Sequence, residues 1–175
     1  IRVILNNQSL RINPFKDKMK ILHVVGGTYV SGAFKGAYIL HKALLKYGID
    51  SKILNDSVNK ELYLNNSDKT IVKFSLFNKF LIRLFCYLEK IFKSIILPSP
   101  RSTFTYSILG LDITKLKVYD DADIIHFHWL SDGFINLKSI SKINKPIVWT
   151  MRDMWPFTGG SHYTMDFEKY ENSMV

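Results

Sequence analysis

The stretch Lys20-Ile-Leu-His-Val-Val-Gly-Gly-Thr-Tyr-Val-Ser-Gly-Ala-Phe-Lys-Gly36 decides the fold of this chain. It begins with a mostly apolar, β-branched run that is typical of a buried strand and that ends at two glycines. Ser31 then opens a helix with apolar residues every three or four positions, and Gly48 ends it. A short strand follows at residues 51–54. The order of strand, glycine loop, helix and strand predicts the start of a Rossmann-like, doubly wound parallel sheet. The helix residues expected to face the sheet are Ala33, Ala37, Leu40, Leu44 and Tyr47.

Strands and helices also alternate in the second half of the chain. Residues 123–128 and 147–150 are short apolar runs typical of buried strands, and residues 134–143 carry a helical pattern. In that helix we expect Leu137 and Ile140 to face inward. This alternation predicts an α/β fold whose parallel strands are joined by right-handed crossovers.

Length and composition indicate a globular domain. The chain has 175 residues, of which 47% are apolar, and this is enough for one sizeable core. We expect that domain at residues 19–175, with residues 1–18 as an N-terminal extension, and both ends resemble those of a fragment. Residues 1–18 lack the apolar central run of a signal peptide, so we expect none here. The single Cys86 excludes an internal disulfide and suits a reducing, cytoplasmic compartment.

The chain is basic, with a net charge of +9 and a pI of about 9.5. Such a balance suits anionic partners, namely nucleic acid, anionic lipid or phosphorylated ligands, although a codon bias toward lysine would also produce it. Among these partners we expect phosphorylated ligands and a membrane surface, and not nucleic acid.

Residues 71–97 form the most amphipathic segment of the chain. Apolar residues recur at alternating steps of three and four, and the basic residues fall largely off that stripe. Charges interrupt every window of ~20 residues, so the segment is not expected to span a membrane. Two interpretations stay open: a helix packed on its own sheet, and a helix lying on the inner face of the plasma membrane. The stripe consists of Phe74, Phe77, Leu81, Leu84, Leu88, Ile91 and Ile95, and the basic residues are Lys79, Arg83, Lys90 and Lys93.

The glycine loop after the first strand is a candidate phosphate site. Glycines let the backbone approach a phosphate, and the helix that follows presents free N–H groups. The candidate residues are Gly26, Gly27, Ser31 and Gly32. The loop matches neither the dinucleotide fingerprint nor a Walker loop. In the alternative interpretation, Gly32 and Gly36 simply permit close packing of the helix on the strand.

His126 and His128 lie two apart in a predicted strand, hence on one face, and Trp129 follows them. Two histidines could contribute to a metal site, but zinc needs at least a third ligand, and His162 is the candidate for it. We expect no metal here. Recognition of a hydroxylated ligand by these side chains is the favoured interpretation, and a structural role for His126 is the alternative.

The loop after the strand at residues 147–150 gathers a cation, a carboxylate and an indole. Open α/β folds bind ligands at the carboxyl ends of their strands. Arg152 suits phosphate or carboxylate, and a tryptophan face suits a sugar or base ring. A packed Trp-Pro turn with a surface pair between Arg152 and Asp153 is the alternative. Beyond these two residues the loop contributes Trp155, Thr158, Gly159, Gly160 and His162. No hydrolase signature is present.

Four motifs in order resemble family 4 glycosyltransferases, closest to the bacterial colanic-acid and capsule-type sugar transferases. They are Met19-Lys-Ile-Leu-His-Val-Val25, the glycine loop with its helix through Asp50, Ala122-Asp-Ile-Ile-His-Phe-His-Trp129 and Trp149-Thr-Met-Arg-Asp-Met-Trp-Pro-Phe-Thr-Gly-Gly160. Together they run through most of the chain.

The resemblance implies the N-terminal half of a two-domain GT-B enzyme. In such enzymes this half mainly holds the acceptor, and a C-terminal half holds the nucleotide sugar. Transfer is expected to retain the anomeric configuration without a metal or other cofactor, and the acceptor is a saccharide or a lipid-linked saccharide used in surface polysaccharide synthesis. By this resemblance the glycine loop lies near the donor phosphates, and Arg152, Asp153 and His128 are catalytic. The acceptor-binding residues would be His126, Trp129, Trp155, Thr158, Gly159, Gly160 and His162.

Two positions depart from the family pattern. Many relatives carry His at the position of Arg152, and relatives in the closest group often carry Cys at the position of Ser161. Nothing in the chain resembles the donor-binding domain, so we expect the chain alone to be inactive. Two alternatives stay open: a non-catalytic Rossmann-like module that binds a phosphorylated ligand, and a peripheral membrane module.

Overall fold

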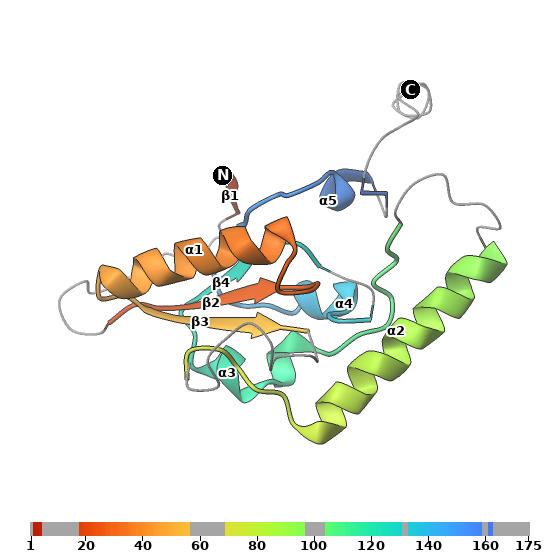
Figure 1. Cartoon of the computed structure of the whole chain (residues 1–175), viewed down its shortest axis with the longest axis horizontal. Coiled ribbons are helices and arrows are strands. Elements are labelled where there is room, and N and C mark those ends of the chain that lie inside the picture. The colour runs from red at the N-terminus through yellow and green to blue at the C-terminus, as the bar shows by residue number, and fades with distance from the viewer. Residues whose placement is uncertain are drawn as a thin grey trace.

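The computed structural model describes residues 2–4, 18–56, 69–96, 104–130, 133–158 and 161–162. Its centre is a five-stranded sheet in the order β1-β5-β4-β2-β3 (Figure 1). Four neighbouring strands are parallel, which confirms the predicted α/β fold with a parallel sheet. The strands are β1 (Arg2–Ile4), β2 (Lys20–Val25), β3 (Asp50–Asn55), β4 (Ile124–Phe127) and β5 (Ile147–Trp149). β1 lies in the segment expected as an extension and pairs antiparallel with β5.

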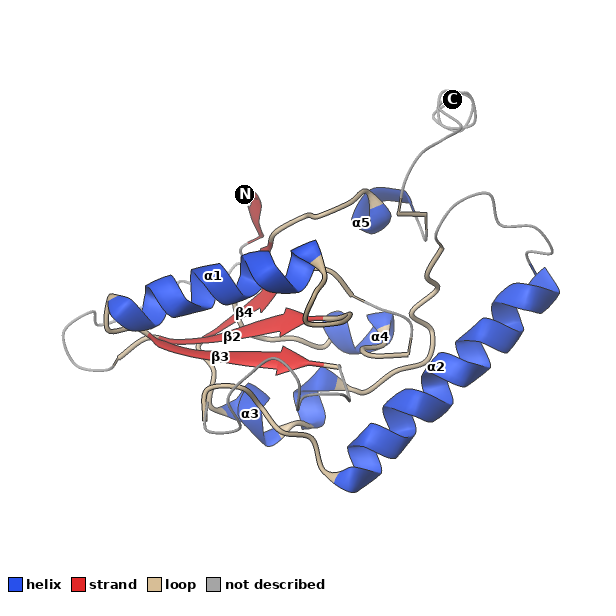
Figure 2. Ribbon diagram, in the orientation of Figure 1, coloured by secondary structure: helices blue, strands red, loops and turns tan. Residues whose placement is uncertain are grey.

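Helices cover both faces of the sheet, with α1 on one side and α3 and α4 on the other (Figure 2). The longest helix, α2, lies at the periphery of the molecule (Figure 1). The helices are α1 (Gly32–Lys46), α2 (Leu76–Ile96), α3 (Lys117–Asp120), α4 (Leu137–Ile140) and α5 (Trp155–Thr158), with a 3-10 turn η2 at Ile113–Lys115.

The two faces of the sheet differ in chemistry. Side chains alternate along each strand, so Leu22 and Val24 of β2 join the main apolar core with Phe127 of β4. The opposite face carries His23 and Val25 of β2 and lies under α1. α1 therefore covers a polar, histidine-rich surface, and the main core lies on the other side of the sheet.

This polar surface changes which side of α1 faces inward. The helix buries Phe34, Ala37 and His41, whereas Tyr47 is 83% exposed, so the predicted inward stripe is wrong at Leu40 and Tyr47. The imidazole of His41 forms hydrogen bonds with Ser51 Oγ at 2.8 Å and with Thr70 Oγ1 at 2.9 Å. A polar partner on the sheet thus favours an inward histidine.

Two other predicted helices have different bounds. Within residues 71–97 the helix begins only at Leu76, where Ser75 Oγ accepts a hydrogen bond from Asn78 N at 3.1 Å, as an N-cap does. Within residues 134–143 only α4 is helical. It begins after Asn136, whose side chain caps it by accepting a hydrogen bond from Ser139 N at 2.7 Å. Leu137 of α4 is exposed, contrary to prediction, whereas Ile140 packs against the core as predicted.

Candidate functional site

The strand order reverses beside β2, and this reversal locates the site. β2 leads through α1 to β3 on one side, while β4 and β5 lie on its other side. The loops that leave the carboxyl ends of β2 and β4 therefore diverge, and α/β sheets bind ligands at such a switch point. The sequence-predicted motifs follow β2, β4 and β5, so the parallel sheet brings all three to one edge.

The glycine loop is held against the loop after β4. Gly26 N donates to Trp129 O at 2.6 Å, and Asn55 Nδ2 donates to Val25 O at 2.7 Å and to Gly27 O at 3.0 Å. Gly27 has a φ of +83°, and a Cβ there would lie 3.1 Å from the Trp129 ring. Both the left-handed backbone and the close contact require glycine at this position.

The other glycines do not serve helix–strand packing. A Cβ on Gly32 would meet nothing within 4 Å. A Cβ on Gly36 would lie 2.5 Å from Arg152 Nη2, and no strand atom is among its nearest neighbours. Ser31 caps α1, since its Oγ accepts from Phe34 N at 3.2 Å.

The guanidinium of Arg152 therefore lies directly on the backbone of α1 at Gly36. Arg152 is exposed, and within the described part of the chain no carboxylate pairs with it. The surface pair with Asp153, which was the alternative interpretation, is not formed, because Asp153 bonds to His162 instead. The edge of the sheet thus presents an uncompensated positive charge beside the glycine loop and α1.

His162 is the centre of a buried network that anchors the loop after β5. Its Nδ1 lies 2.5 Å from Asp153 Oδ2 and its Nε2 lies 2.8 Å from Thr105 Oγ1. Trp129 Nε1 lies 3.0 Å from the same His162 Nδ1, and the Trp155 indole donates to Thr105 O at 2.8 Å. The polar atoms of these predicted site residues are therefore used within the protein, which favours a positioning role for them.

Thr105 was missed at the sequence level, since a lone threonine far along the chain gives no signal. Thr158 is half-buried and donates to Ser161 O. Gly159 and Gly160 lie outside the described residues.

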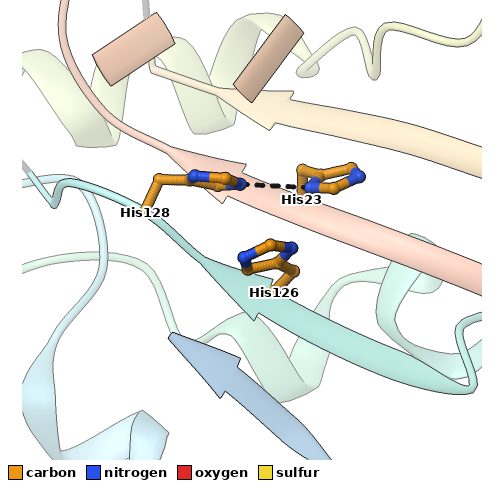
Figure 3. A group of neighbouring side chains, drawn as sticks. All are labelled: His23, His126 and His128. Carbon is orange, nitrogen blue, oxygen red and sulfur yellow. Dashed lines mark hydrogen bonds between the residues drawn. The ribbon is translucent and has the colours of Figure 1, made fainter. Parts of the chain in front are cut away.

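Three buried histidines, His23, His126 and His128, lie together on the sheet (Figure 3), and Arg152 is close enough to lower the pKa values of His126 and His128. His23 and His126 are register partners in β2 and β4, and His128 Nε2 lies 3.1 Å from His23 Nδ1. His126 Nε2 is hydrogen-bonded to Thr150 Oγ1 at 2.8 Å. Sequence analysis missed His23, although the pairing of β2 with β4 would have placed it beside His126.

All three histidines are neutral at pH 7. Burial, together with the neighbouring histidines, lowers the pKa of His23 from 6.5 to about 3. Burial and then the charge of Arg152 lower the pKa of His126 to about 4. Burial and neighbouring charges lower the pKa of His128 to about 2. Uncharged imidazoles each offer one hydrogen-bond donor and one acceptor nitrogen, so these side chains can bond to one another and to a neutral ligand group.

The cluster has the donor set of a metal site. One nitrogen from each of His23, His126 and His128 lies within 4.8 Å of the others, and neutral imidazole is the form that binds metal. His23, and not the predicted His162, is the third member. The positive charge of Arg152, which lowers the pKa values of His126 and His128, also opposes a cation at this position. The site is therefore better suited to an anion at Arg152 than to a metal among the histidines.

No protein-family model matches the chain, and no curated protein or solved structure is significantly similar to it. Among the described residues, no helix is long and apolar enough to cross a membrane.

Proposed function

We propose that this chain is the Rossmann-like, acceptor-side domain of a retaining GT-B glycosyltransferase. It would take part in the transfer of a sugar from a nucleotide sugar to a saccharide or lipid-linked acceptor in the synthesis of a bacterial surface polysaccharide. The strand order around β2 and the resemblance of four ordered motifs support this proposal. We further propose that the domain works in the cytoplasm, where nucleotide sugars are made.

One observation carries the proposal: Arg152, which pairs with no carboxylate among the described residues, lies on α1 beside the glycine loop at the switch point. Arginine binds phosphate oxygens through a two-pronged, charge-assisted hydrogen bond. A fixed positive charge at this edge can stabilise the diphosphate that leaves during transfer without a metal ion. Trp129, half-buried beside Gly27, offers a ring edge close to the same loop.

The roles proposed for individual residues follow from their contacts. Arg152 binds the phosphates, and Asp153 holds the loop of Arg152 in place through His162. His126 and His128 supply hydrogen bonds from beneath the site, since at neutral pH they carry no charge. The donor pocket itself is proposed to lie on a second domain.

A second candidate is a non-catalytic module that binds a phosphorylated ligand. It is favoured by the positions of the titratable groups at the edge: among the described residues, the Asp153 carboxylate is bonded to His162, and His23, His126 and His128 are buried. Both candidates place an anion at Arg152, but only the first involves turnover.

Calorimetric titration with UDP, pyrophosphate and UMP tests the shared part of the two candidates. We expect both diphosphates to bind more tightly than UMP, and Arg152→Ala to weaken their binding roughly 10- to 100-fold, as for the loss of a charge-assisted hydrogen bond. Equal affinity of the wild type and Arg152→Ala would refute the phosphate site.

Turnover separates the two candidates. The chain alone should transfer no sugar, because transfer requires both reactants in one geometry. In the complete reading frame, the glycosyltransferase proposal expects sugar transfer from a nucleotide sugar, detected by mass spectrometry, which Arg152→Ala abolishes. Diphosphate binding without any transfer by that complete protein would favour the binding module.

A further inference from the structure

Helix α2 turns its most apolar side toward solvent. Six side chains at steps of three and four form one continuous stripe along its outer face. The exposed fraction is 66% for Phe77, 60% for Phe80 and 62% for Tyr87. The stripe consists of Phe77, Phe80, Leu84, Tyr87, Ile91 and Ile95, and Leu76 and Phe92 are exposed next to it.

The opposite side of α2 is held against the protein. Ile82 is buried in the main core, and Phe85 packs against it. Glu89 is also buried, and its Oε1 accepts from Leu109 N at 3.1 Å. The backbone of Cys86 is so close to Gly133 that a Cβ on that glycine would lie 2.2 Å from Cys86 N. The contacts of the inward side therefore determine that the stripe faces solvent. The sequence pattern alone did not indicate which side of the helix would face inward.

The charges along α2 select the partner for this face. Lys79, Arg83 and Lys90 form a row on one edge of the stripe, because they are spaced four and seven residues apart. The only acidic residue of the helix, Glu89, faces the protein. Lys93, which was expected in the basic row, is half-buried on the inward side. An apolar stripe with a basic edge complements a surface whose outer layer is anionic and whose interior is apolar.

We propose that α2 lies in the headgroup region of an anionic membrane, with its apolar stripe inserted among the acyl chains. The helix is too charged to span a bilayer, and a helix of this length and pattern is typical of an interfacial one. An antiparallel symmetric contact between two copies would bring each basic row close to its own equivalent, which disfavours that arrangement of a second copy. This inference does not depend on the proposed function.

Sedimentation with lipid vesicles tests the inference on the intact chain. We expect binding to vesicles of equal parts phosphatidylcholine and phosphatidylglycerol, little binding to phosphatidylcholine alone, and loss of binding as NaCl rises from about 50 to 500 mM. Neutralising the basic row with Lys79→Gln, Arg83→Gln and Lys90→Gln should lower the partition coefficient about 100-fold. The matched control is the triple variant Lys115→Gln, Lys117→Gln and Lys138→Gln, which removes three exposed charges outside α2. Its affinity for the vesicles should be only slightly below that of the wild type, because its net charge is lower by the same three units.

Insertion of the stripe is measured separately by tryptophan fluorescence. Phe80→Trp should shift its emission to the blue on anionic vesicles, whereas Ile39→Trp, on the exposed side of α1, should not. Equal loss of binding in the two glutamine variants, or no blue shift for Phe80→Trp, would overturn the inference. So would a dimer in sedimentation velocity that Phe80→Asp dissociates, since that result would assign the face to a second copy.

Discussion

Gly36 is the most informative position for a substitution, because only its missing side chain lets Arg152 lie on α1. In Gly36→Ala the new Cβ would fall 2.5 Å from Nη2, 2.6 Å from Nη1 and 2.8 Å from Cζ of Arg152. Those atoms are the far end of a flexible, exposed side chain, so the guanidinium would swing away and the backbone would stay in place. Alanine in a helix interior is favoured over glycine by about 1 kcal/mol. The variant should therefore be as stable as the wild type or slightly more stable.

Ligand binding should change in the opposite direction. A hydrogen bond to a charged group contributes about 1.5–3 kcal/mol, so displacing Arg152 should weaken binding of pyrophosphate roughly 10- to 150-fold. Gly36→Ala and Arg152→Ala should have similar effects, and the double variant should be no weaker than either, because both remove one interaction. Ile39→Ala, on the exposed side of the same helix, is the control.

Two measurements on the same protein samples decide the matter: calorimetric titration with pyrophosphate, and the melting temperature by circular dichroism. The reasoning fails if Gly36→Ala binds pyrophosphate like Ile39→Ala while Arg152→Ala does not, since Arg152 would then act from another position. It also fails if Gly36→Ala lowers the melting temperature, since the contact would then be structural.

Three further predictions concern the elements around the site. The free energy of unfolding should be steady above pH 6.5 and fall as the pH drops from 6.5 toward 4. In this range the histidines of the unfolded chain take up protons, whereas in the folded chain His23 and His128 stay neutral because their pKa values are about 3 and 2. The loss should be on the order of a few kcal/mol in urea titrations, and a His23→Gln, His128→Gln variant with an unchanged slope would contradict it. Asn55→Ala should destabilise the chain by about 1–3 kcal/mol, since it leaves two carbonyls of the glycine loop without this donor; an unchanged urea midpoint would refute that role. Gly27→Ala should cost about 1–2 kcal/mol for its left-handed backbone and should also shift the indole resonance of Trp129; a neutral effect on both would mean that the loop is not held as described.

The fold was largely predictable from local patterns. The strands β2, β3, β4 and β5 are short apolar runs separated by helical or polar segments, and parallel pairing follows from that alternation. The contact of the glycine loop with Trp129 was not predicted, although parallel strands do place their carboxyl ends on one edge.

What failed was the choice of inward side for the helices. Apolar periodicity predicts that the apolar side of a helix faces the core. In α1 the sheet offers Ser51 as a partner, so His41 faces inward and Tyr47 faces out. In α2, whose orientation was left open, the predicted stripe divides: Leu81 packs against the core, whereas Phe77 and Ile95 face solvent. Which side of a helix faces inward depends on the side chains of the element that it packs against, and the sequence of the helix alone does not show these.

Residues of the site escaped prediction for a similar reason. His23 was hidden inside a strand pattern and became noticeable only when β2 paired with β4 in register. No carboxylate in the described part of the chain pairs with Arg152, because Asp153 bonds to His162 instead, and that pairing is a tertiary contact across a loop. Thr105 joins this network from a distant part of the chain.

The central claim, that the carboxyl edge around Arg152 binds phosphates, is tested most directly by nuclear magnetic resonance of the three tryptophan indole groups. The indole nitrogen of Trp129 lies 3.0 Å from His162 Nδ1, the Trp149 N–H donates to His128 O, and the Trp155 N–H donates to Thr105 O. Titration of the ¹⁵N-labelled chain with UDP should move the Trp129 signal saturably, because its ring touches the glycine loop, and should move the buried Trp155 signal little. The same titration on Arg152→Ala should leave Trp129 unmoved at equal concentrations. A Trp129 signal that stays fixed while UDP binds, or that moves equally in both proteins, would contradict the phosphate site.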